Sequence, residues 1–117
     1  MSTFTKNKLS GATNGKQIKI VATATPGTTI HTATSSTSAD VWDEIWIYAS
    51  NNDTVSRTLT LEWGGTASPD DVSTVTLAPG TRVLVSDGRI LQNSLIVKGF
   101  ASAANVVCVD GFVNAIT

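Results

Sequence analysis

Few side chains in this sequence have the chemistry that catalysis needs. His31 is the only histidine and Cys108 the only cysteine, and Cys108 lies within the apolar run NVVCVDGFV. A nucleophilic site needs a nucleophile, a base and an orienting acid within hydrogen-bond reach, and no G-x-S-x-G motif is present. Zinc needs several His or Cys ligands. The sequence therefore favours a small buried thiol at Cys108 and predicts neither a nucleophilic site nor a zinc site.

The carboxylates do not form a convergent pair either. Asp43 and Glu44 are adjacent in a segment with strand character, so they point to opposite faces and do not flank one glycosidic bond. Asp70 and Asp71 follow a proline, where turn hydrogen bonds explain them. No D-x-D-x-D-G string for calcium is present. We therefore expect no enzymatic activity, no metal and no cofactor.

The three tryptophans have two possible uses. Trp42 and Trp46 share one parity of a strand-like segment, with Glu44 between them, and Trp63 ends the next such segment. Exposed aromatic rings bind sugars and single-stranded nucleic acid by stacking, whereas most aromatic side chains serve cores or subunit contacts. We favour a core or contact role, and the ligand platform at Trp42 and Trp46 remains the alternative.

These residues sit in a chain whose composition favours strands. Thr and Ser number 18 and 12, and only 15% of residues are charged; β-branched Thr suits a pleated surface. Period-2 alternation predicts about eight short strands. Residues 42–50 are apolar on both parities near their middle, which predicts a central strand covered on both sides. The expected strands are 18–24, 28–33, 42–50, 57–63, 72–77, 81–86, 94–101 and 105–116.

This pattern predicts an all-β fold, an antiparallel β-sandwich or jelly-roll-like arrangement. The Ala78-Pro79-Gly80 connection fits a hairpin, Asp87-Gly88 signals a further turn, and the last two strands are expected to pair. The expected core comprises Leu59, Leu61, Trp63, Val75, Leu77, Val83, Val85, Val97, Val107 and Val109.

The first residues differ from the rest. Residues 1–16 have no sustained period and contain turn signals, so they predict an extended N-terminal arm on a sandwich domain of residues 17–117. The first 19 residues carry four lysines and no acid, whereas the whole chain has a net charge of −1. We expect this basic segment to leave the body and bind a neighbouring subunit through Phe4, Lys6, Lys8, Leu9, Lys16 and Lys19.

Charge and hydropathy exclude two classes of partner. A net charge of −1 argues against a general nucleic-acid binder, which needs many basic residues on one face. No apolar run approaches the length of a membrane helix, and no N-terminal segment resembles a signal peptide. We expect a soluble protein made in a reducing cytoplasm.

The strings DEIWIYASNNDTVSRTLTLEWGGTASPDD and LIVKGFASAANVVCVDGFVNAI, separated by a hydroxyl-rich segment, carry a resemblance. From about residue 28 to its end, the chain resembles small virion structural proteins of tailed bacteriophages, particularly head decoration (cement) proteins. The resemblance implies a β-sandwich subunit, made in the bacterial host cytoplasm and placed on the capsid surface. It further implies trimers that bind the major capsid protein. Two alternatives remain open: a tail, neck or fibre-adaptor protein, and a carbohydrate-binding module that uses the tryptophans.

Overall fold

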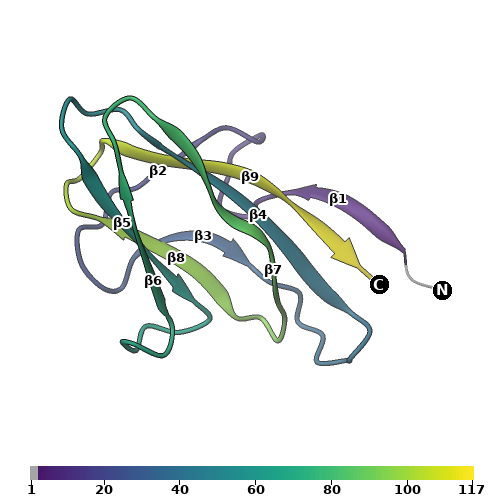
Figure 1. Cartoon of the computed structure of the whole chain (residues 1–117). Coiled ribbons are helices and arrows are strands. Elements are labelled where there is room, and N and C mark those ends of the chain that lie inside the picture. Colours follow the sequence, from purple (N-terminus) through teal and green to yellow (C-terminus); the bar gives the residue numbers. More distant parts are fainter. Residues whose placement is uncertain (1–2) are drawn as a thin grey trace.

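The computed structural model describes residues 3–117 and contains strands but no helix over that range. Two antiparallel sheets pack face to face (Figure 1), which confirms the predicted all-β sandwich. The strands are β1 (Phe4–Lys8), β2 (Ile18–Lys19), β3 (Thr28–Thr32), β4 (Trp42–Asn51), β5 (Arg57–Trp63), β6 (Val72–Leu77), β7 (Arg82–Leu91), β8 (Ile96–Ala101) and β9 (Val107–Ile116).

The strand order explains how the sheets are built. Sheet A has the order β1-β9-β4-β7, with β2 also pairing with β9, and sheet B has the order β3-β8-β5-β6. β4 lies inside sheet A between β9 and β7, so the prediction of a central strand is confirmed. The expected cover on both sides is not, because the outward residues of β4 are only half-buried. Most successive strands from β3 onward alternate between the two sheets. This alternation favours the jelly-roll part of the expectation, which stays a prediction.

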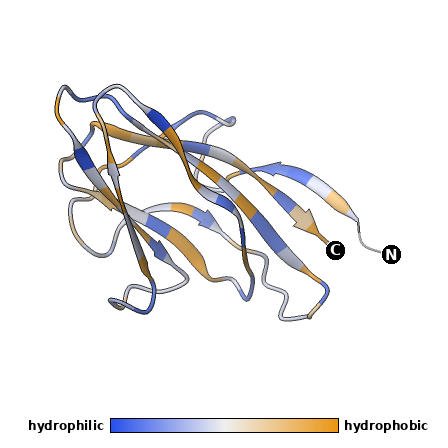
Figure 2. Ribbon diagram, viewed as in Figure 1, coloured by the Kyte–Doolittle hydropathy of each residue, from blue (hydrophilic) through white to orange (hydrophobic). Residues whose placement is uncertain are grey.

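The core lies between the sheets and comes mainly from alternate residues of strands β2 to β9, as the colour changes along the strands in Figure 2 illustrate. Of the ten residues expected in the core, six are fully buried: Leu59, Leu61, Leu77, Val97, Val107 and Val109. Trp63, Val75, Val83 and Val85 are partly buried and pack against that core. Period-2 alternation therefore located the inward faces correctly.

The expected hairpins were wrong. β6 belongs to sheet B and β7 to sheet A, so the Ala78–Gly80 connection crosses between sheets. Its crossing is fixed by backbone bonds, because Gly80 N–H donates to Asn51 O and Asn51 N–H donates to Thr81 O. β8 and β9 are likewise in different sheets. A short connection that contains Gly and Pro can form a hairpin within one sheet or cross between two sheets. Its sequence therefore does not reveal to which sheet the next strand belongs.

The prediction of a turn at Asp87-Gly88 was also wrong. Both residues lie within β7, beside shifts in the register of its pairing with β4. Gly88 has a φ of 88°, a conformation that glycine adopts without a Cβ penalty. The dipeptide therefore forms an irregularity inside a continuous strand.

The extended arm is not confirmed. Residues 1 and 2 of that expected segment lie outside the described residues, but Phe4–Lys8 form β1 and pair antiparallel with β9. Leu9 is 1% exposed and belongs to the core, which corrects its expected role as an anchor in a partner. Gly11 N–H donates to Ile30 O, which ties the next turn to β3. The segment is too poor in apolar residues to fold alone, but pairing with β9 and burial of Leu9 order it within its own chain.

Candidate interaction surface

β4 presents two chemically different faces. Asp43, Ile45, Ile47 and Ala49 are buried between the sheets, whereas the alternate residues are half-buried and face away from sheet B. Those alternate residues are Trp42, Glu44, Trp46 and Tyr48. The predicted opposition of Asp43 and Glu44 is therefore confirmed. A central strand with three aromatic residues on its outward side gives sheet A an unusual outer surface.

The register of β4 with its neighbours extends this surface across the sheet. Directly paired residues share a face, so the surface includes further side chains from β9, β7 and β1. We define the outer face of sheet A as the residues Phe4, Lys6, Lys8, Trp42, Glu44, Trp46, Tyr48, Leu84, Asp87, Ile90, Asp110, Phe112, Asn114 and Ile116. Of these, Ile116 is itself buried.

An aromatic stack forms the centre of this face. The rings of Trp46 and Phe112, which are direct partners across β4 and β9, have centroids 6.0 Å apart and an interplanar angle of 10°. Lys6 Nζ lies 4.4 Å from the centroid of the Phe112 ring. Offset aromatic pairs and cations over rings are both attractive because of the ring quadrupole. The three side chains thus join β1, β9 and β4 on one surface.

Glu44 fixes the orientation of the Trp46 ring. Trp46 Nε1 donates to Glu44 Oε1 at 2.7 Å, and Asn114 Nδ2 donates to the same oxygen at 3.0 Å. These two bonds hold the pKa of the Glu44 carboxyl below its ordinary value, and the bond from Trp46 has the larger effect. Desolvation of the carboxyl acts in the opposite direction. Glu44 is therefore an ionised acceptor at neutral pH that positions an aromatic ring.

A second cluster lies farther along the same face. The Arg82 guanidinium carbon is 4.1 Å from the centroid of the Tyr48 ring, and Arg82 Nη2 is 2.6 Å from Asp110 Oδ2. The bond to Asp110 raises the pKa of Arg82 above its ordinary value. Arg82 and Asp110 Oδ2 are thus paired within the chain, whereas Asp110 Oδ1 is buried and has no hydrogen-bond partner among the described residues.

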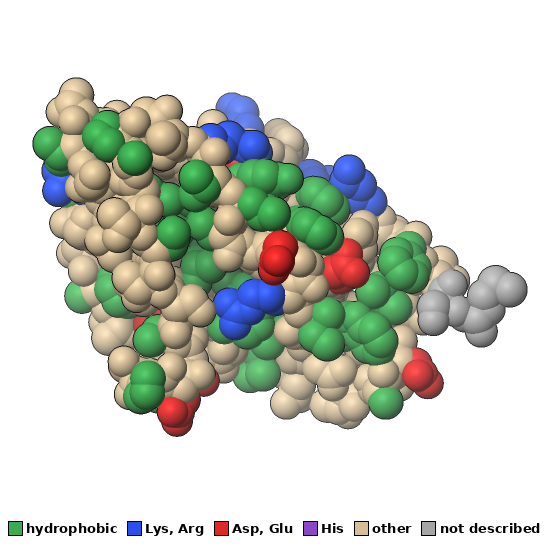
Figure 3. All heavy atoms as spheres, viewed as in Figure 1, with side chains coloured by type: hydrophobic (Ala, Val, Ile, Leu, Met, Phe, Trp, Pro, Cys, Tyr) green, Lys and Arg blue, Asp and Glu red, His purple; other side chains and the backbone are tan. Residues whose placement is uncertain are grey.

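Large apolar side chains surround these clusters. Phe4 is 64% exposed, Ile90 55% and Leu84 43%. Figure 3 shows hydrophobic side chains gathered over sheet A, with acidic and basic groups among them and further basic groups along the upper border. Exposed single apolar residues are ordinary, but contiguous apolar surface indicates an interaction site.

The expected contact residues divide into three places. Phe4, Lys6, Lys8, Trp42 and Trp46 lie on the outer face of sheet A. Lys16 is exposed on the loop before β2, and Lys19 is exposed on β2. Leu9 is buried.

Trp63 is separate from both other tryptophans. Its ring lies 4.0 Å from the Arg89 guanidinium carbon, and its Nε1 donates to Ile90 O at 3.3 Å. Because Trp63 is on β5 and Arg89 on β7, this contact joins the two sheets. It supports the expected core or contact role for Trp63.

Sequence reasoning missed several members of the outer face. Tyr48, Leu84, Ile90 and Phe112 were not singled out, and neither was Arg82, whose guanidinium lies over the Tyr48 ring. Tyr48 shares the parity of Trp42 and Trp46, which was a usable signal. Phe112 and Ile90 lie on strands whose pairing with β4 is long-range, so their proximity to the tryptophans was not readable.

The only histidine lies inside the sandwich. His31 and Asp43 are 5% and 7% exposed, and His31 Nε2 is 2.8 Å from Asp43 Oδ2. The backbone N–H of Ser10 donates to His31 Nδ1, so Nε2 carries the proton and donates to Asp43. Ser10 Oγ instead accepts a bond from Thr32 N–H. These hydrogen bonds link the turn at Ser10 to β3 and β4. Ser10 Oγ bonds to the backbone of Thr32 and not to the imidazole, as a nucleophile activated by His31 would.

Glu62 lies on the parity of β5 opposite Leu59 and Leu61, which strand alternation alone predicts to face water, but the structure buries it. It is 1% exposed because the loop between β2 and β3 covers it. Its Oε2 accepts a bond from Thr25 Oγ1 at 2.5 Å and its Oε1 one from Gly27 N–H at 2.6 Å. The carboxylate thus replaces the hydrogen bonds that water would give to this loop.

Concave features are small. A pocket of about 180 Å³ is lined by residues that include Gly64, Thr66, Leu95 and Lys98, below the several hundred Å³ typical of ligand sites. Among residues 3–117, no group of three or more His, Cys, Asp or Glu side chains is placed to hold a metal ion.

The fold and this outer face define the chain as an all-β sandwich with an aromatic surface on one sheet. Comparison with protein-family models, with curated proteins and with solved structures finds no match. Within the described part of the chain, no helix is long and apolar enough to cross a membrane.

Proposed function

We propose that this protein is a non-enzymatic structural subunit of a bacteriophage virion, a decoration protein that binds the major capsid protein lattice and stabilises it. The observation that supports the proposal is the outer face of sheet A. In this proposal the subunits associate as trimers on the capsid surface, as the sequence resemblance implies.

The chemistry of the face suits a protein partner. Interface centres are rich in Trp, Tyr, Phe and Arg and poor in unpaired charge. Trp42, Trp46, Tyr48 and Phe112 supply rigid rings, while Glu44 is already bonded within the chain. Covering such a face desolvates apolar area and leaves few polar groups without partners, so burial is favourable.

A binding assay on particles tests this face directly. Purified protein is added to phage particles that lack it, prepared from the phage that encodes the chain. The bound fraction is then measured by sedimentation. Ile90→Lys places a charge on the outer face and should abolish binding, because a buried unpaired charge is costly. Val21→Lys is the matched control, since Val21 is also 55% exposed but lies outside the strands of sheet A. Equal binding by wild type and Ile90→Lys would contradict the proposal.

Imaging separates the proposal from its nearest alternative. Electron microscopy of particles bearing the tagged protein should show density over the head lattice. Density confined to the tail or neck would support a tail, neck or fibre-adaptor protein instead.

The same face favours one candidate from another class. Trp46 is half-buried and oriented by Glu44, and oriented aromatic rings stack on sugars. If the chain is a carbohydrate-binding module, Trp42→Ala and Trp46→Ala should each abolish glycan binding and leave the fold intact. Particle binding that survives both substitutions, together with glycan binding that does not, would favour this second candidate.

A further inference from the structure

β1 exposes one complete backbone edge. Thr3 and Thr117 exchange both backbone hydrogen bonds, and hydrogen-bonded pairs alternate along an antiparallel ladder. Thr5 and Asn7 therefore continue the bonding to β9, whereas the N–H and C=O groups of the alternate residues point away from it. These outward residues are Phe4, Lys6 and Lys8. β1 is the last strand of sheet A on this side, and all five of its residues are exposed (Figure 1).

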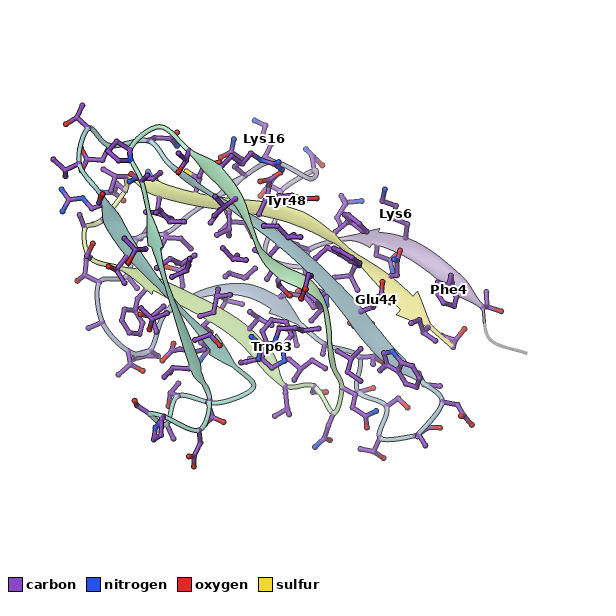
Figure 4. The ribbon with its side chains drawn as sticks, in the orientation of Figure 1. Phe4, Lys6, Lys16, Glu44, Tyr48 and Trp63 are labelled. Atoms are coloured by element: carbon purple, nitrogen blue, oxygen red, sulfur yellow. The ribbon has the colours of Figure 1, made fainter. Side chains whose placement is uncertain are left out.

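Uncompensated positive charge follows this edge. Lys6 and Lys8 lie on β1, and Lys16 and Lys19 lie on the next turn and strand against the same side of β9. The ion pairs formed within residues 3–117 join Arg57 to Asp53 and Arg82 to Asp110, and none of them involves these lysines. Figure 4 shows Lys6 and Lys16 along the upper side of the sheet, with Phe4 at its end.

We propose that the free edge of β1 binds an acidic, extended segment of a partner protein as an added antiparallel strand. Strand addition uses backbone bonds for affinity and alternate side chains for specificity. In an antiparallel pair, the partner residues that lie opposite Lys8, Lys6 and Phe4 point to the same face of the sheet as these three residues. Read from its N-terminus, the partner segment therefore has the pattern acidic-x-acidic-x-apolar.

A second copy of the chain is a poorer occupant of this edge. Antiparallel pairing of two β1 strands centred on Lys6 places lysine opposite lysine, and like charges directly opposite destabilise a sheet. Lysines on an edge strand also prevent edge-to-edge aggregation. The same lysines therefore reject copies of this chain and select an acidic strand. The backbone edge of β1 is distinct from the outer face of sheet A, although the side chains of Phe4, Lys6 and Lys8 belong to both. The inference goes beyond the proposed function because it concerns the backbone groups of this edge.

The test uses the intact protein and the peptide Thr-Glu-Thr-Glu-Thr-Ile-Thr, with binding followed by calorimetry. Replacing Lys6 and Lys8 by Gln should weaken binding about fivefold to tenfold, as expected for two exposed ion pairs. Replacing Lys16 and Lys19 by Gln removes the same charge away from β1 and should have a much smaller effect. Equal weakening by the two double variants would mean general electrostatic attraction and would overturn the inference.

Two modified peptides test the strand geometry. N-methylation at the Glu and Ile positions blocks the bonds to β1 and should abolish binding, whereas N-methylation at the intervening Thr positions should leave it unchanged. A peptide of the same composition with adjacent glutamates, Thr-Glu-Glu-Thr-Ile-Thr-Thr, should bind weakly. Undiminished binding of either the blocked or the rearranged peptide overturns the proposal.

The remaining outcomes concern other occupants. No detectable binding of the alternating peptide overturns the inference. The inference is also overturned if an oligothymidylate binds more tightly than the peptide and loses affinity to the same extent when Lys6 and Lys8 are replaced by Gln. Self-association in sedimentation that is lost in Lys6→Pro would assign the edge to a second copy instead. None of these outcomes affects the particle assay with Ile90→Lys.

Discussion

His31 on β3 and Asp43 on β4 form a buried pair that joins sheet B to sheet A, with Nε2 and Oδ2 2.8 Å apart. Each partner has a further bond, from Ser10 N–H to His31 Nδ1 and from Thr34 N–H to Asp43 Oδ2. The pair therefore links two strands and two connecting segments at one point. Removing one partner leaves a polar group buried inside the sandwich.

We predict that His31→Ala lowers the free energy of unfolding by about 3–5 kcal/mol, because it leaves Asp43 buried without its main partner. Chemical denaturation measures the change. Thr29→Ala, at an exposed position on the same strand, should stay within about 0.5 kcal/mol of wild type. The double variant with Asp43→Ala should cost less than the sum of the single changes; strict additivity would show that the pair contributes no coupling.

The second prediction compares two leucines. Leu61 is 2% exposed and Leu84 is 43% exposed. Leu61→Ala should destabilise the protein by about 2–5 kcal/mol, because it removes buried methyl groups and leaves a cavity. Leu84→Ala should change stability by about 0.5 kcal/mol or less. Similar unfolding midpoints for the two variants would contradict the assignment of inner and outer faces.

The third prediction concerns the loop held by Glu62. Glu62→Ala leaves Thr25 Oγ1 and Gly27 N–H without their acceptor, and hydrogen bonds to a charged group are worth about 1.5–3 kcal/mol each. Amide hydrogen exchange at Gly27 should accelerate markedly in this variant. Glu62→Gln keeps one carbonyl acceptor and should accelerate it less. Unchanged exchange in Glu62→Ala would mean that other contacts order the loop.

The fourth prediction is the pH behaviour of Glu44. Trp46→Phe removes the Nε1 donor, so the pKa of Glu44 should rise toward its ordinary value. Because the folded-state pKa is depressed, the stabilisation by Glu44 is present above the ordinary pKa of 4.5 and is lost as the pH falls through the folded value. NMR titration of the side-chain carboxyl carbon reports the change. Trp63→Phe is the control, since Trp63 Nε1 donates to Ile90 O instead, and it should leave the titration of Glu44 unaltered.

The sequence predicted local features better than pairing. Alternation along residues 57–63 located Leu59 and Leu61 in the core, because strand geometry alone decides which residues share a face. The same alternation failed for Glu62, since a loop distant from β5 in the sequence covers it. Covering of one segment by another is a tertiary property that periodicity does not contain.

The interaction surface was predictable only in part. The shared parity of Trp42 and Trp46 was visible in one strand, but the stack of Trp46 on Phe112 depends on pairing between β4 and β9. The basic N-terminal charge was also visible. Its position on a sheet edge was not, because the apolar residues of the segment looked too few for folding, while backbone pairing with β9 and burial of Leu9 give it a place.

The place of β9 between β1 and β4 has a consequence for synthesis of the chain. A ribosome makes Val107–Ile116 after every other strand described, yet these residues form the middle of sheet A. Until they emerge, β1 has no partner and one side of β4 has unsatisfied backbone groups. Sheet A therefore closes only after β9 has been made, and a nascent chain stalled before β9 should remain sensitive to protease, whereas a chain that includes β9 should be resistant.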